Sequence, residues 1–371
     1  MAETDADESF SIRRDGTALA LSGGGFRATL FHCGALLRLN ELGILPKVSR
    51  ISSVSGGSIA SGMLAAAIVR HGDAIYSNLE GFVVEPLRAF CRRSVDTAAV
   101  GWGALLPGKS IGDVLADTYD DLFGGLLLGE LREMPQFVFN ATNLQTGRLV
   151  RLRRDTLRDW TIGETDSGHI RLAVAVAASS AFPPVLSPVD IDLDPASWRN
   201  LEGTKHFGDL DYCTRLSLTD GGAYDNLGLE TVDNFGTVIV SDAGAPFGTE
   251  PSASGLWHKQ ALRALDIATD QARALRKRLL FAQCKADKRV AIYCGIDADP
   301  SRYPASQALR PAPEMISRLA RIRTRLDPFS EEEQGLLINW GWLAMDIAVR
   351  STIAVKVAAP AAYPVPAHAL A

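Results

Sequence analysis

The sequence predicts an α/β protein, and three stretches carry that prediction. The apolar run 17–21 leads into a glycine-rich loop, 22–27, which opens a helical pattern. A second short strand turns at Ser55 directly into the small, apolar helix 58–69. A third apolar run delivers Asp220 to a pair of glycines. Strands that pass through tight turns into helices are typical of a sheet covered by helices.

The turn at Ser55 has the composition of a nucleophile elbow. Its frame is Ser53-Val54-Ser55-Gly56-Gly57, and the usual pattern is G-x-S-x-G. Small residues are needed there because the strained turn brings neighbouring backbones into contact. Ser53 replaces the first glycine but keeps the side chain small. Read alone, the stretch is equally compatible with a serine-rich turn that carries no chemistry.

The loop of Gly23, Gly24 and Gly25 places backbone N–H groups beside a helix N-terminus. Such donors suit a phosphate or the oxyanion of an acyl-transfer intermediate, since both are compact negative oxygens. The G-x-G-x-x-G fingerprint and the G-x-x-x-x-G-K-[ST] motif are both absent from the chain, which makes nucleotide binding the weaker option.

Taken in order, a G-G-G-x-R loop ending at Arg27, the serine elbow and the Asp220-Gly221-Gly222 turn resemble the patatin-like phospholipase family. The stretches 140–147 and 178–184 are also similar to that family, so the resemblance covers roughly residues 17–230. Ser53 and Ala28 depart from the pattern, because glycine is common at both places.

The resemblance implies a three-layer α/β/α sandwich around a mostly parallel sheet. It implies Ser55 as the nucleophile on an elbow completed by Gly56 and Gly57, and Asp220 as its base. It also implies an oxyanion hole made by the amides of residues 23–25, with Arg27 nearby. The expected activity is that of a serine lipid acyl hydrolase of the phospholipase A type, with no cofactor or metal. The alternatives are a soluble esterase or thioesterase with the same dyad, and a non-catalytic phosphate-binding protein.

Other residues compete for the role of base. Asp242 also follows a strand and precedes a glycine, but it lacks the D-G-G motif. In an α/β-hydrolase triad a histidine follows the acid, and only His258 or His368 could serve. Neither lies near a motif, so the sequence favours a Ser–Asp dyad.

The chain has 371 residues, which we interpret as one domain over 15–357. An acidic, disordered tail is expected at 1–14 and a proline-containing tail with little to pack at 358–371. The region 71–134 reads as helical, either as ordinary packing or as a lid or membrane-facing rim. Residues proposed for that rim are Trp102, Leu105, Leu106, Leu126, Leu127 and Leu128. Further strands are expected at 136–141, 149–152, 237–240 and 289–293, and helices at 170–180, 256–281 and 331–350.

Composition narrows the partners and the compartment. A net charge of −5 argues against nucleic acid. Five cysteines without C-x-x-C spacing read as reduced, buried thiols of a cytoplasmic protein. The acidic start is not a secretory signal, and no run of eighteen uncharged apolar residues occurs, so membrane contact is expected to be peripheral.

Overall fold

The computed structural model describes residues 13–95, 110–303 and 309–370. In these ranges ten strands form one mixed sheet. Eight of them follow the order β10-β9-β1-β2-β3-β4-β5-β6, while β8 pairs with β3 and β7 pairs with β8. The strands are β1 (Arg13–Leu21), β2 (Val48–Ser53), β3 (Gln136–Asn143), β4 (Arg148–Leu152), β5 (Leu157–Asp159), β6 (Gly163–Thr165), β7 (Val189–Asp192), β8 (Arg215–Asp220), β9 (Phe235–Asp242) and β10 (Val290–Gly295).

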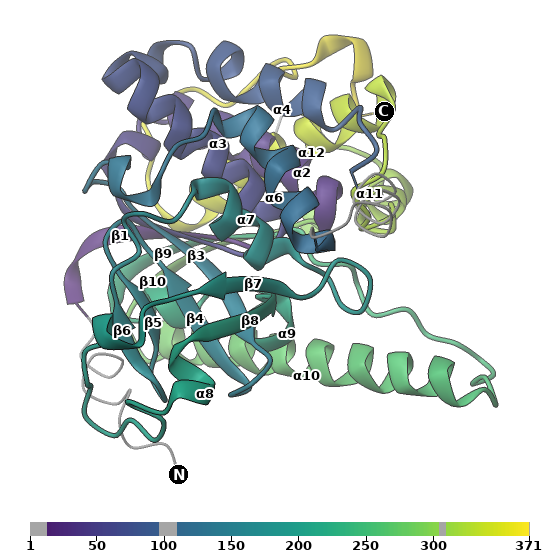
Figure 1. Cartoon of the computed structure of the whole chain (residues 1–371). Helices are drawn as coiled ribbons and strands as arrows, with labels where there is room; N and C mark the ends of the chain where they lie inside the picture. Colours follow the sequence, from purple (N-terminus) through teal and green to yellow (C-terminus); the bar gives the residue numbers. More distant parts are fainter. Residues whose placement is uncertain (1–12, 96–109, 304–308, 371) are drawn as a thin grey trace.

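Helices cover both faces of this sheet. One face carries most of them, and α10 runs along the opposite face beside α9 (Figure 1). The helices are α2 (Gly25–Glu41), α3 (Gly56–His71), α4 (Glu85–Phe90), α6 (Ile111–Phe123), α7 (Leu172–Ser180), α8 (Leu210–Cys213), α9 (Gly222–Asp225), α10 (Trp257–Lys285), α11 (Pro313–Ala320) and α12 (Glu331–Thr352). The predicted three-layer α/β/α class is confirmed.

The sheet has a parallel part and an antiparallel part. Strands β10, β9, β1, β2 and β3 are parallel neighbours, so their carboxyl ends meet at one edge. The strands from β4 to β6 continue the sheet in antiparallel pairs. Strand β8 pairs with the last residues of β3, beyond the point where β2 ends. The sheet therefore brings the end of β8 to the carboxyl edge of the parallel strands.

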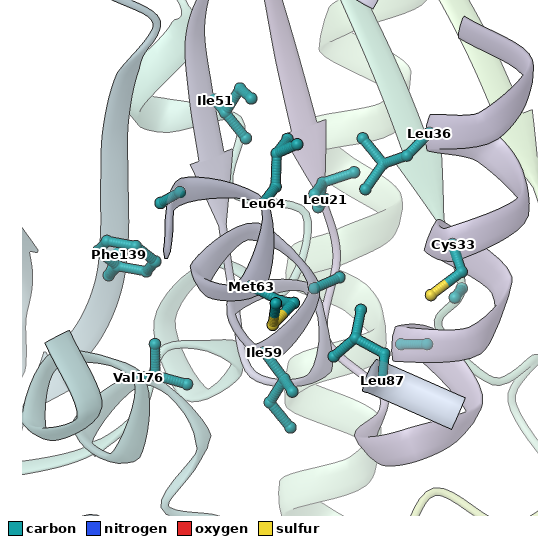
Figure 2. Close-up of a cluster of buried hydrophobic side chains, with 14 of the residues drawn as sticks. Leu21, Cys33, Leu36, Ile51, Ile59, Met63, Leu64, Leu87, Phe139 and Val176 are labelled. Carbon is teal, nitrogen blue, oxygen red and sulfur yellow. The ribbon is translucent and has the colours of Figure 1, made fainter. Parts of the chain in front are cut away.

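The main core lies between the sheet and the larger helical layer. Side chains from β1, β2, β3 and the helices α2, α3 and α7 interdigitate there (Figure 2). Helices α2 and α12 cross at very close range, because a Cβ at Gly34 would lie 2.0 Å from the Ile338 carbonyl oxygen. A second, smaller core lies under α10 and includes Val238, Val240 and Leu280. The sheet therefore has an apolar core on each of its two faces.

The predicted elements around the motifs are confirmed, from the helix after the glycine loop to the final helix α12. The C-terminal tail differs from its prediction. Asn339 of α12 donates hydrogen bonds to the Val365 and His368 carbonyls, and Leu370 is buried. The buried Asn339 amide therefore holds in place a segment whose composition alone suggested little packing.

The region 71–134 is mostly helical in its described residues, with turns between the helices, which agrees with the prediction. Leu128 is fully buried, while Leu126 and Leu127 are half-buried. The other rim candidates, Trp102, Leu105 and Leu106, lie outside the described residues. Leu128 therefore belongs to the core, which favours ordinary packing over a lid or membrane-facing rim at this residue.

None of the five cysteines, all of which are described, forms a disulfide. No helix in the described ranges has the length and apolar character needed to cross a bilayer.

Candidate active site

Ser55 occupies a strained turn between β2 and α3. Its backbone has φ 52° and ψ −122°, a combination that a residue with a Cβ rarely adopts. The two following glycines are required by contact: a Cβ at Gly56 would lie 2.1 Å from the Gly25 carbonyl oxygen, and one at Gly57 would lie 2.4 Å from that of Leu21. The stretch has the geometry of a nucleophile elbow.

The departure at Ser53 has a structural explanation. Its side chain is buried, and its hydroxyl lies 3.0 Å from those of Ser58 and Ser61. It also donates to the Val138 carbonyl at 3.3 Å. A hydroxyl is therefore accommodated where glycine is usual, because it joins a buried hydrogen-bond cluster beneath the elbow.

Asp220 ends β8 next to Ser55. Ser53 pairs with Phe139, and Asp220 pairs with Ala141 two residues further along β3, so Asp220 is level with Ser55. The Asp220 carboxylate accepts the Gly222 N–H at 2.6 Å, and the nearby Ser55 hydroxyl favours its ionised form. The Asp220 residue is 4 % exposed. Burial raises its pKa from 3.8 to about 6, although the Ser55 hydroxyl and the Gly222 N–H oppose that shift.

Ser179, near the end of α7, accepts hydrogen bonds from the backbone of Ser55 and from the residue that follows Asp220. The Ser55 N–H donates to both the carbonyl and the hydroxyl oxygen of Ser179, each at 3.1 Å. The same carbonyl accepts the Gly221 N–H at 3.2 Å, and the Ser179 hydroxyl donates to the Asn140 carbonyl. From the sequence alone, the stretch 178–184 shows only its similarity to the family. A helix of small residues does not reveal which backbone atoms at its end will accept hydrogen bonds.

The glycine loop offers two free donors to the cleft rather than three. The Gly23 N–H donates to the Asn226 carbonyl at 3.0 Å, so it is already occupied. The N–H groups of Gly24 and Gly25 have no partner among the described residues. Both glycines have positive φ, 141° and 58°, which keeps side chains out of this loop. The predicted oxyanion donors are therefore reduced to Gly24 and Gly25.

Arg27 stabilises the glycine loop through hydrogen bonds to three backbone carbonyls. Its Nη atoms donate to the carbonyls of Ala243 at 2.7 Å, Ile322 at 2.8 Å and Ala320 at 3.1 Å. Burial lowers its pKa to about 10. Because these donors are engaged, the side chain ties the start of α2 to the segment after α11. We therefore interpret Arg27 as a positioning residue of the glycine loop.

Asp242 has a different environment from Asp220. Its carboxylate accepts two hydrogen bonds from Arg273, at 2.7 and 3.1 Å, and others from the Tyr293 hydroxyl and the Gly244 N–H. Burial raises the pKa of Asp242, but Arg273 and these donors outweigh it and hold the pKa below its ordinary value. A carboxylate held this way is a weak base, so the rival candidate is better explained as a structural ion pair.

No histidine lines the cleft that contains Ser55 and Asp220. All six histidines of the chain are among the described residues. His32 lies beside the glycine loop, where its ring nitrogens contact the Ser241 hydroxyl at 2.8 Å and the Ser22 carbonyl at 2.9 Å. Burial lowers its pKa to about 4, so the ring is neutral at pH 7 and bridges two strand ends.

Ser55 and Asp220 open into a cleft of about 640 Å³. Its apolar part is formed by the loop after α7, by Phe247 and by Leu265 of α10. Charged side chains from α10 and from the segment after α11 line other parts. No described residue of 71–134 lines it. The site therefore combines an apolar space with a candidate nucleophile, base and oxyanion donors.

A family model described as patatin-like phospholipase matches residues 19–233, which is more than half of the chain. The chain belongs to the patatin-like phospholipase family. The matched range contains the glycine loop, Ser55 and Asp220. Comparison with curated proteins found no match.

Solved structures agree with this patatin-like fold. A structure of human GIVD cytosolic phospholipase A2 is similar, with a TM-score of 0.54 and 13 % identity over 93 % of this chain and 61 % of that one. Its complex with methyl γ-linolenyl fluorophosphonate gives a TM-score of 0.53 at 15 % identity, over 92 % and 58 % of the two chains. The chain thus spans about three fifths of that protein. At this identity the likeness concerns the fold.

Proposed function

We propose that the protein is a serine lipid acyl hydrolase of the phospholipase A type, in which Ser55 and Asp220 act as a catalytic dyad. The observation that supports it best is the pairing of a strained, glycine-flanked serine with a buried carboxylate whose pKa lies near 6. At pH 7 to 8 such a carboxylate is mostly ionised, yet it is a stronger base than an exposed aspartate.

In the proposed reaction Asp220 accepts the Ser55 hydroxyl proton as the Ser55 oxygen attacks the ester carbonyl carbon. The N–H groups of Gly24 and Gly25 stabilise the resulting oxyanion. Collapse breaks the ester bond, and the leaving lysolipid oxygen takes the proton from Asp220. Water then attacks the acyl-Ser55 ester, gives a proton to Asp220, and the fatty acid leaves as Ser55 regains its proton.

A fluorophosphonate probe tests this proposal directly. We expect rapid covalent labelling at Ser55, read by mass spectrometry, and no label in Ser55→Ala. The labelling rate should rise with pH and level off above a midpoint near 6, because only ionised Asp220 can accept the proton. A folded protein that stays unlabelled at Ser55 would remove the hydrolase proposal.

We further propose that the apolar mouth of the cleft touches a lipid surface. Phe182 is 61 % exposed, and Val185, Phe247 and Leu265 are also exposed around the same opening. Contiguous apolar side chains beside a binding cleft mark interaction surfaces. This group replaces residues 126–128 as the proposed rim, because Leu128 is buried and none of the three lines the cleft.

Replacing Phe182 and Phe247 together with serine should lower the ratio of vesicle phospholipid hydrolysis to soluble short-chain ester hydrolysis at least several-fold. Each side chain loses roughly 1.5–3 kcal/mol of burial in the lipid surface. The matched control is the double change Leu144→Ser and Leu210→Ser, since both residues are exposed and neither lines the cleft. An unchanged ratio in the first variant would instead favour the soluble esterase alternative.

A further inference from the structure

The segment after α11 forms a wall of the cleft and lies outside the residues matched by the family model. Thr324, Arg325 and Leu326 line the cleft. The segment is anchored to the oxyanion loop, because the Phe26 N–H donates to the Arg325 carbonyl at 3.2 Å. A Cβ at Gly25 would lie 2.1 Å from the Thr324 carbonyl oxygen, so the two backbones are in close contact. Arg325 is therefore held beside the reacting centre.

Arg325 differs from the other arginines of this cleft. Arg27 donates to backbone carbonyls, and Arg273 is paired with Asp242. Arg263 donates to the Gly248 carbonyl and lies near Glu250. The exposed Arg325 side chain has neither an ion pair nor a hydrogen bond within the described ranges. It is the cleft guanidinium that remains available to an anion.

A different wall carries the opposite charge. Asp266 and Asp270 of α10 line the cleft, and their carboxylates have no ion pair or hydrogen bond with any described residue. An anionic group near them would be repelled, whereas an ammonium group would be attracted. The cleft thus presents an available guanidinium and two available carboxylates around one opening.

We propose that Arg325 binds the phosphate of a phospholipid head group, while Asp266 and Asp270 attract its ammonium group. A guanidinium suits phosphate because its fork of N–H donors matches two phosphate oxygens. The cleft then selects zwitterionic phospholipids over anionic phospholipids and over neutral glycerides. This inference rests on the proposed hydrolase function and adds the substrate class that the site prefers.

The test compares three lipids with identical acyl chains in the same non-ionic detergent micelles: phosphatidylethanolamine, phosphatidylglycerol and diacylglycerol. The wild-type protein should show its highest kcat/KM on phosphatidylethanolamine. Arg325→Gln should lower the ratio of phospholipid to diacylglycerol kcat/KM about tenfold, since a charged hydrogen bond to phosphate is lost. The double change Asp266→Asn and Asp270→Asn should instead lower the ratio of phosphatidylethanolamine to phosphatidylglycerol about fivefold.

Arg321→Gln is the matched control, because Arg321 is exposed on the same segment but does not line the cleft. It removes the same charge and should leave every ratio unchanged. An equal loss on all three lipids in Arg325→Gln, or an unchanged ratio, would overturn the role of Arg325 while leaving the hydrolase proposal intact. A wild-type protein inactive on all three lipids would contradict the proposed function, and the inference would fall with it.

Discussion

Ser55→Ala and Asp220→Asn are each expected to lower ester hydrolysis by about 10²-fold or more, with the protein still folded. Ser55→Ala removes the oxygen that attacks the ester. Asp220→Asn keeps the shape of the side chain, including an acceptor for the Gly222 N–H, but cannot take a proton. Initial rates on a soluble ester and on micellar phospholipid, with circular dichroism for the fold, measure both effects.

Asp242→Asn is the comparison that decides between the two carboxylates. This change removes the buried carboxylate that pairs with the largely buried Arg273 guanidinium, and it should destabilise the protein by about 3 kcal/mol. Activity per folded molecule should nevertheless be mostly retained, because Asp242 does not contact Ser55. An active Asp220→Asn together with a folded but inactive Asp242→Asn would show that the base is misassigned.

Asp220→Asn is also expected to stabilise the protein at neutral pH. The pKa of Asp220 is raised from 3.8 to about 6 on folding, so its ionisation opposes folding. This free-energy cost is absent at a pH below the pKa of Asp220 in the unfolded chain, and it is complete at a pH above the pKa in the folded protein. A shift of this size corresponds to about 3 kcal/mol, which the variant should recover at pH 7 to 8.

Urea denaturation of both proteins from pH 4.5 to 8 measures this effect. The advantage of Asp220→Asn should grow through pH 5 to 6 and then level off. Asp242→Asn is a control that should change the free energy of unfolding in the opposite direction. The pKa of Asp242 is lowered, so its ionised form stabilises the fold. A stability difference for Asp220→Asn that does not vary with pH would show that burial does not raise the pKa of this carboxyl.

The sequence was sufficient to predict the α/β class and the order of strands and helices around the three motifs, whereas the choice of Asp220 as the partner of Ser55 came from the family resemblance and stays a prediction. Local physics explains this success. A glycine-flanked turn after an apolar run restricts both its backbone and its neighbours, so Ser55 and the loop at Gly24 could be located without knowledge of distant residues.

Only the tertiary structure decided which donors are free and which charges are paired. The Gly23 N–H is occupied by the Asn226 carbonyl, and Arg27 is bound to carbonyls about 300 residues away along the chain. The pKa of Asp220 depends on burial, and its alignment with Ser55 depends on where β8 joins β3. These properties come from contacts between segments far apart in sequence, which local residue patterns do not encode.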